Sequence, residues 1–292
     1  MAICRTGRAH HRHRPLRCVG ARPQSPADLQ APVNALERDL DPDGVWRRYA
    51  NDALAGPYQT LFGRLDQLVL LAAPVGQMDA IMAAMAPHLR PGTIVTDAGS
   101  TKFNVVEAAR AALGDRFADF VPGHPIAGSE QCGPGAARID LYRGKRVVLT
   151  PQIDTRADAV ATVRLLWEAA GAQVETLDAG LHDRVFAAVS HLPHLAAYAL
   201  VDDLAQRADS DTCFRFAASG FRDFTRIAGS SPEMWRDIAL ANREAVLAEL
   251  DAYLASLQAL RQAVDAEDAN ALLKMFSRAR NARENWIKAQ DS

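Results

Sequence analysis

The residue whose chemistry stands out first is His124, which lies in a stretch dense in glycine and proline. Residues 121–135 read Val-Pro-Gly-His-Pro-Ile-Ala-Gly-Ser-Glu-Gln-Cys-Gly-Pro-Gly, a composition typical of a shaped loop. Phe117 and Phe120 precede it like the end of a short strand. A histidine at a strand end is well placed to move a proton near neutral pH. Alone, it could as well be a loop histidine bonded to backbone, and only residues farther along favour the chemical interpretation.

The segments that would position this loop alternate between strand and helix from Leu65 to about Asp178. Continuous apolar runs are typical of buried parallel strands, and helical periodicity fills the stretches between them. The predicted strands are 68–73, 93–96, 146–150 and 173–177, and the predicted helices are 77–89, 105–113 and 157–170, the last ending at Gly171. The alternation predicts a doubly wound α/β sheet that binds ligands at the carboxyl ends of its strands.

After residue 178 the pattern is helical throughout. Helices are predicted over 182–207, 232–263 and 265–290, with Ser231 as a cap and Pro232 in the first turn of the second. Long helices cannot bury their apolar stripes alone, so we expect this half to pack against a second copy of the chain. The expected domains are therefore 1–178, an α/β dinucleotide-binding domain, and 179–292, a helical substrate and dimerisation domain.

Bulk composition excludes several classes of protein. The 292 residues carry a net charge of −2, which gives no basic field for nucleic acid. The four cysteines are scattered, without metal-ligand spacing, so we expect no metal and a cytoplasmic location. No apolar run is expected to reach the roughly 18 residues of a membrane span.

Five segments in order carry a resemblance to a known family. Residues 97–102, 123–133, 182–183, 190–194 and 220–227 together resemble the prephenate dehydrogenases, a group that includes arogenate and cyclohexadienyl dehydrogenases. The resemblance implies a Rossmann-like domain followed by a helical dimerisation domain, and a homodimer. It also implies oxidation of prephenate by NAD, or NADP, with release of carbon dioxide. The product, 4-hydroxyphenylpyruvate, lies on the route to tyrosine.

The resemblance also assigns catalytic and cofactor-binding residues. His124 matches the group that accepts the proton of the substrate hydroxyl, and Ser100 matches the serine that orients this hydroxyl beside the nicotinamide. A helix N-cap is a compatible role for Ser100. Pro74, Ser100 and Lys102 are the expected cofactor contacts. Lys102 could instead be a solvated surface lysine.

Three further residues are assigned to the substrate, which carries two carboxylates. Arg226 matches an arginine that holds one of them through paired hydrogen bonds, although an ion pair with Asp223 or Asp237 is the alternative. His194 is expected to line the substrate pocket and His191 to be structural. Asp183 resembles an aspartate near the pocket, with a carboxylate at a helix start as the alternative. Trp235 is expected to pack between helices.

The N-terminal 64 residues depart from the family pattern. The sequence has no G-x-G-x-x-G, the motif that lets backbone approach a pyrophosphate. It has Arg-His-Arg-Pro-Leu-Arg over 12–17, an R-x-R-x-x-R that becomes glycine-rich if CGG codons are read one base later. We therefore hypothesise a frameshift that ends before about Leu65. If the residues are as printed, we expect weak cofactor binding, because arginine cannot replace glycine against phosphate. Arogenate dehydrogenase and an inactive remnant that only dimerises are the alternative functions.

Overall fold

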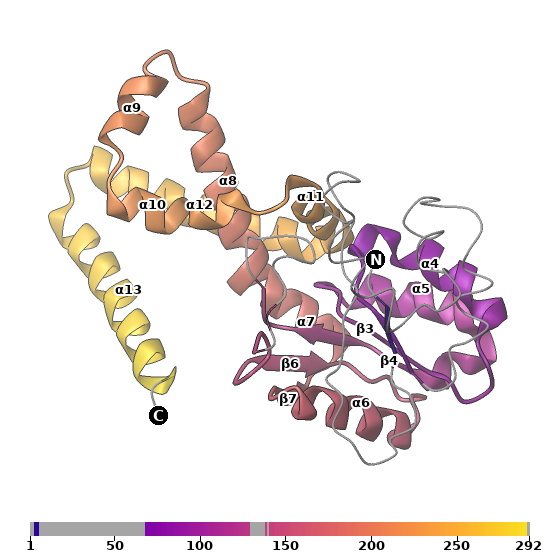
Figure 1. Cartoon of the computed structure of the whole chain (residues 1–292). Helices are drawn as coiled ribbons and strands as arrows, with labels where there is room; N and C mark the ends of the chain where they lie inside the picture. Colours follow the sequence, from indigo (N-terminus) through magenta and orange to yellow (C-terminus); the bar gives the residue numbers. More distant parts are fainter. Residues whose placement is uncertain (1–2, 6–67, 129–137, 139, 291–292) are drawn as a thin grey trace. The chain divides into compact units, whose positions relative to one another are not determined.

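The computed structural model describes residues 3–5, 68–128, 138 and 140–290 (Figure 1). The basic segment over 12–17 and most of the loop after Gly128 lie outside these residues, so the frameshift hypothesis stays a prediction. The chain divides into two compact units, 1–243 and 244–292, which are described separately.

The described residues of the first unit form two small sheets. The first has the order β1-β2-β3-β4 and the second the order β5-β6-β7. Their strands are β1 (Ile3–Arg5), β2 (Leu68–Leu71), β3 (Ile94–Asp97), β4 (Phe120–Val121), β5 (Gly123–Pro125), β6 (Arg146–Leu149) and β7 (Gln173–Thr176). The pairs β2–β3, β3–β4 and β6–β7 are parallel, as expected for an α/β fold. The first sheet ends with β4 and the second begins with β5, and between these strands lies Pro122, which has no N–H to donate to a strand ladder.

The pairing of β1 is the feature that differs most from a complete Rossmann sheet. In that order the strand equivalent to β2 is flanked on one side by β3 and on the other by a parallel first strand. Here β1 occupies that second side and runs antiparallel, with Ile3 opposite Leu71.

Strand β2 is buried on both faces, which explains its unbroken apolar run, whereas the edge strand β7 is mostly exposed. Val69 and Leu71 pack with the apolar sides of α4 and α5, while Leu68 and Leu70 pack with α6 on the other face. Figure 1 shows α4 and α5 on one side of the strands and α6 on the other. Side chains alternate along a strand, so each face needs its own helical cover.

The helices follow the predicted periods closely in the first half of the chain. Among the described residues of the first unit they are α4 (Met78–Met85), α5 (Phe103–Leu113), α6 (Ala157–Ala169), α7 (Ala179–Phe186), α8 (Leu192–Ala205), α9 (Ser210–Phe216), α10 (Ser219–Thr225) and α11 (Pro232–Ala241). Short 3-10 turns are η1 (Val75–Gln77), η2 (Ala86–His88), η3 (Gly114–Asp119) and η6 (Arg226–Gly229). Gly171 follows α6 with φ of 86°, a conformation that glycine adopts freely.

The long helix predicted over 182–207 is interrupted by a π-helical segment, η5 (Ala187–His191), between α7 and α8. Pro193 lies in the first turn of α8, where its missing N–H has little effect on the helical hydrogen bonds. Ser231 caps α11 as predicted, because its side chain accepts a hydrogen bond from the Met234 backbone N–H.

The prediction of one helix over 232–263 is wrong. The structure ends α11 at Ala241 and begins α12 (Arg243–Asp265) after Asn242. Asn242 is buried and its side chain bonds groups from two other segments. A straight helix would not hold that side chain in the same place.

The second unit consists of the rest of α12 and α13 (Ala269–Gln290). The turn between them has Glu267 at φ of 50°, so α13 starts later than the predicted Asp265. Several large apolar side chains of this unit are exposed in the single chain: Leu247, Leu254, Leu257, Leu273, Phe276 and Trp286.

One helical stretch among the described residues, Ala179–Ala205, is long and apolar enough to cross a membrane by length and composition. This differs from the expectation that no run reaches that length. The same stretch contains buried His182, Asp183 and His191, which bond polar groups of neighbouring segments. Only 17% of its apolar window is buried in the single chain, and these polar contacts belong to its buried positions.

Candidate active site

His124 lies in strand β5 and not in an irregular loop as predicted. Strand β5 pairs antiparallel with β6, with His124 opposite Val148, so the backbone on which the imidazole sits is fixed. The side chain stays partly exposed. Its Nδ1 lies 2.8 Å from Nε2 of His182, which belongs to α7. A histidine from the sheet and one from the helical half are therefore in direct contact.

Asp183 joins this pair to the start of α5. Its Oδ1 lies 2.7 Å from Nδ1 of His182. The same carboxylate accepts hydrogen bonds from the backbone N–H groups of Lys102, at 2.8 Å, and Phe103, at 2.9 Å. A carboxylate at a helix N-terminus is favoured by the helix dipole and by the free N–H groups there. Asp183 is thus a carboxylate at a helix start, which was the alternative considered for it, but the helix is α5 and not its own helix α7.

Lys102 lies beneath the site as a fully buried cation. Its ammonium bonds the carboxylate of Asp97 and donates to the carbonyl oxygen of Gly123 at 2.6 Å. Asp97 also accepts from the backbone N–H groups of Gly99, at 2.8 Å, and Gly123, at 3.0 Å. This network ties the end of β3 to the residue before His124. The surface alternative for Lys102 is wrong, and its burial argues against direct contact with a cofactor.

The protonation states follow from this environment. Burial is the largest cause that lowers the pKa of His124 well below 6.5, and the nearby Lys102 and His182 add to it. Burial also lowers the pKa of His182, against the opposing effect of its hydrogen bond to Asp183. Burial works to raise the pKa of Asp183, but its hydrogen bonds from His182 and from backbone lower it overall. The site therefore holds two neutral imidazoles and one carboxylate near neutral pH.

Ser100 and Pro74 lie at the carboxyl ends of neighbouring parallel strands. Pro74 is exposed and follows β2, while the partly exposed Ser100 follows β3. Ser100 does not cap α5: the N-cap position is Lys102, whose N–H is bonded by Asp183. The carboxyl ends of adjacent parallel strands are where an open α/β sheet binds a dinucleotide.

His194 belongs to a second cluster, built around Trp235. The two rings stack with centroids 3.6 Å apart and an interplanar angle of 19°. His191 meets the same indole edge-on at 6.0 Å. Trp235 also packs with Val75 and Ile238, as the prediction of helix packing requires. His194 itself is partly exposed, and its Nδ1 lies 2.8 Å from the carbonyl oxygen of Ser190.

Asn242 links the two clusters. Its amide donates to the carbonyl oxygen of Asp183 at 2.8 Å and lies 3.1 Å from Nδ1 of His191. Burial lowers the pKa of His191 to about 4, so its Nδ1 is free to accept that hydrogen bond. His191 is thus buried and structural in its contacts, in agreement with what was expected of it.

Arg226 is exposed at the start of η6. The turn packs against α8, the helix of His194, and Tyr198 of α8 donates to the carbonyl oxygen of Ser230 at 2.6 Å. Asp237, one of the two aspartates considered as an ion-pair partner of Arg226, is bonded by Arg236 at 2.7 Å. The structure therefore joins His124 to Asp183 through His182. It places His194 in the second cluster and Arg226 on the turn that packs against the His194 helix.

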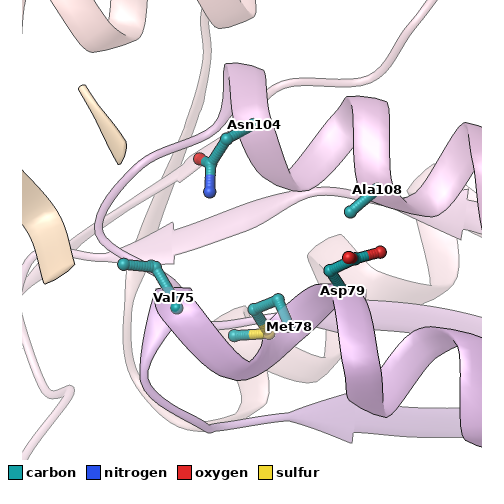
Figure 2. A pocket seen from close by; sticks show the side chains of 6 residues that line it. Val75, Met78, Asp79, Asn104 and Ala108 are labelled. Carbon is teal, nitrogen blue, oxygen red and sulfur yellow. The ribbon is translucent and has the colours of Figure 1, made fainter. Parts of the chain in front are cut away.

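A pocket of about 430 Å³ opens between η1, α4 and α5. Figure 2 shows the Asn104 amide directed into it, across from Val75 and Met78. Its lining contains none of the predicted site residues, although Val75 directly follows Pro74.

Sequence reasoning missed three residues of the site. His182 was noted only as part of a motif, yet it is the direct partner of His124; its position next to an aspartate was the available signal. Asp97 and Asn242 were given no role. Nothing near Asn242 in the sequence indicates that it reaches Asp183 and His191, because those residues are more than 50 positions away.

Comparison with protein families gives two adjoining matches. Residues 57–176 match the nucleotide-binding domain of prephenate dehydrogenase, and residues 178–278 match its dimerization domain. The chain is 39% identical over 222 residues to cyclohexadienyl dehydrogenase of Zymomonas mobilis, covering 75% of each chain. It is 37% identical over 221 residues to prephenate dehydrogenase of Bacillus subtilis, covering 74% of this chain and 58% of the relative.

Solved structures agree. Prephenate dehydrogenase of Aquifex aeolicus, in complex with hydroxyphenyl propionate and NAD+, has a TM-score of 0.74 and 34% identity, with 85% of this chain and 87% of that chain covered. Synechocystis arogenate dehydrogenase has a TM-score of 0.68 and 26% identity, covering 85% and 89%. Together with the two domain matches, these similarities show that the chain belongs to the prephenate dehydrogenase family, as a Rossmann-like oxidoreductase with a helical dimerisation domain.

Proposed function

We propose that this chain oxidises prephenate with NAD, releasing carbon dioxide and forming 4-hydroxyphenylpyruvate for tyrosine biosynthesis. The observation that carries the proposal is the partly exposed His124, held neutral by its surroundings at the edge where parallel strands end. The family match and the NAD+ in the Aquifex aeolicus relative support the choice of substrate and cofactor.

His124 is the proton acceptor in this proposal. The substrate hydroxyl gives its proton to the imidazole while the carbon that bears it loses hydride, and loss of carbon dioxide completes the aromatic ring. A base is useful only if it is unprotonated at the working pH. Burial, with Lys102 and His182, lowers the pKa of His124 and so keeps it in that form. Ser100, partly exposed after β3, is assigned to orient the same hydroxyl.

The cofactor would lie at the carboxyl ends of β2 and β3, beside Pro74 and Ser100. The fit rests on two residues that follow neighbouring parallel strands, the exposed Pro74 after β2 and the partly exposed Ser100 after β3. Gly99 beside them leaves room for the Asp97 carboxylate, because a Cβ there would lie 2.9 Å from Asp97 Oδ2. NAD supplies the hydride acceptor when bound. Lys102 acts from below, by holding Asp97 and Gly123 in place.

The helical half would bind the substrate carboxylates and a second subunit. Arg226 and His194 are assigned to the substrate, the first for its paired N–H donors and the second for its place on the Trp235 ring. Asp183 is assigned to the substrate site around His124, to which it is linked by its hydrogen bond with His182. Exposed apolar residues on α12 and α13, together with the dimerization-domain match, support a homodimer. The boundary near residue 178 is supported by the meeting of the two family matches.

The relatives are biosynthetic dehydrogenases, which supports a soluble protein, and a cytoplasmic location is part of the proposal. The first 64 residues bear on cofactor affinity. As printed they lack the glycine-rich turn, so we expect weak NAD binding from this chain and restored binding if the shifted frame is repaired.

The test is turnover of prephenate with NAD, followed by NADH absorbance, with arogenate as a second substrate and isothermal titration for NAD. The printed chain and the frame-repaired chain are compared. We expect prephenate to be preferred. Faster turnover of arogenate would reassign the substrate, and absence of turnover by the repaired chain would indicate a remnant that only dimerises.

Two variants of the active chain separate the roles. His124→Asn should lower kcat by about 10²–10⁴-fold with little effect on NAD binding, whereas Arg226→Ala should mainly raise KM. Arg222→Ala is the matched control, because it removes an exposed arginine from the adjacent α10. Unchanged turnover of His124→Asn would remove His124 from its role.

A further inference from the structure

We propose that His182 is a positioning residue that fixes His124 in the tautomer with its proton on Nδ1 and its lone pair on Nε2. The inference deepens the proposed function and rests on it. It concerns which nitrogen of His124 is able to accept a proton, a question that the identity of the base leaves open.

The geometry is a chain of three groups. Asp183 Oδ1 lies 2.7 Å from His182 Nδ1, and His182 Nε2 lies 2.8 Å from His124 Nδ1. The far end of the chain is anchored, because the Asp183 carboxylate accepts the backbone N–H groups of Lys102 and Phe103. The other end, the His124 ring, keeps partial exposure.

Counting protons along this chain gives one consistent arrangement. An ionised carboxylate only accepts hydrogen bonds, so Nδ1 of His182 must carry the proton. A neutral imidazole has a single N–H, so Nε2 of His182 must then be the acceptor. The bond to His124 therefore requires the proton on His124 Nδ1. The remaining nitrogen of His124, Nε2, has the lone pair.

The surrounding charges favour the neutral form of both rings. Lys102 lies close enough to disfavour a second positive charge on either ring, and His191 acts in the same direction on His124. Asp183 and Asp97 oppose this at His182, but burial has the largest effect. Both rings are therefore neutral, so the contacts around them decide which nitrogen carries the proton and do not stabilise an imidazolium cation.

Packing also limits rotation of the rings. Phe186 meets both, with ring centroids 4.8 Å from His124 and 4.5 Å from His182. A flipped His124 ring would place its Cδ2 carbon where Nδ1 lies and would lose the hydrogen bond to His182 Nε2. The aspartate, the second histidine and the phenylalanine all come from α7, so one helix of the dimerisation domain sets the state of a base in the other domain.

The direct test reads the tautomer and does not depend on turnover. The full chain labelled with ¹⁵N-histidine is studied by long-range proton–nitrogen correlation near pH 7.5, as wild type, His182→Gln and His182→Phe. We expect wild-type His124 to carry its proton on Nδ1. In His182→Phe, which has no acceptor, we expect a mixture of tautomers. In His182→Gln, whose amide oxygen can accept, we expect the Nδ1 form to be largely kept.

Kinetics provide the second measurement. His182→Phe should lower kcat by about 10²-fold or more, at the low end of what a positioned base supplies, with KM and NAD affinity within a few-fold. His182→Gln should recover much of the loss. His191→Gln is the control: it replaces another buried histidine that bonds Asn242 and not His124, and it should leave the His124 tautomer unchanged.

The outcomes separate cleanly. A wild-type proton on Nε2 of His124, or an unchanged tautomer in His182→Phe, would overturn the inference whatever the enzyme's activity. If His182→Phe does not fold, the wild-type spectrum decides, because a proton on Nε2 of His124 overturns the inference by itself. Failure of prephenate turnover with the expected tautomer pattern would count against the proposed function and leave the positioning role standing.

Discussion

Buried His191 makes the stability of this protein depend on pH in a way that one substitution can isolate. Its side chain is 1% exposed, lies 3.1 Å from the Asn242 amide and meets the Trp235 ring. Burial lowers its pKa from 6.5 to about 4 in the folded chain. The unfolded chain therefore takes up a proton at a higher pH than the folded chain does.

The sign and size follow from linkage. Folding favours the neutral form of His191. The free energy of unfolding is therefore highest above pH 6.5, and it falls as the pH drops from there toward 4, because only the unfolded chain takes up the proton in this range. With these two pKa values, His191 hardly changes the free energy of unfolding at pH 7.5. At pH 5 it lowers the free energy of unfolding by about 2 kcal/mol. Replacement of His191 by glutamine removes the titrating group and should remove this part of the loss.

The assay is urea unfolding of wild type and His191→Gln at pH 7.5 and pH 5. Glutamine will itself destabilise the core, so the informative quantity is the difference between the two proteins at each pH. We expect that difference to shrink by about 2 kcal/mol between pH 7.5 and pH 5. An equal difference at both pH values would show that His191 titrates normally, and the reasoning from burial would be refuted.

Two further predictions concern the network beneath His124. Lys102→Met should lower the free energy of unfolding, measured in urea, by about 3–5 kcal/mol, because it leaves the buried Asp97 carboxylate without its cation. The double variant with Asp97→Asn should recover part of this loss. A loss below about 1 kcal/mol in Lys102→Met would contradict the buried ion pair. Gly123→Ala should lower kcat with a smaller effect on overall fold, since the new Cβ would lie 2.9 Å from the Asp97 carbonyl oxygen and 3.3 Å from Leu149. Circular dichroism and NADH production measure these two effects, and full activity of the alanine variant would show that the strand can shift without disturbing His124.

The sequence determined much of the α/β half by itself. Strands such as Leu68–Leu71 are buried on both faces, and that leaves a continuous apolar run that can be read without any neighbour. Helices α5 and α6 and the end at Gly171 were predicted within a few residues for the same reason, because periodicity and glycine act locally. The family was evident from His124, Ser100 and Arg226 with their surrounding residues.

Tertiary structure alone decided the rest. The break at Asn242, the burial of Lys102 and the partner of His124 all depend on contacts between groups 21 to 81 positions apart in the sequence. A polar group can be buried only where hydrogen-bond partners surround it. The spacing of residues in the sequence does not indicate which distant residues will be those partners. Asp183 shows this most clearly, because a carboxylate of one helix caps the start of another. The sequence thus predicted which groups would do the chemistry, and the packing of α7 on the sheet decided which atoms of those groups meet.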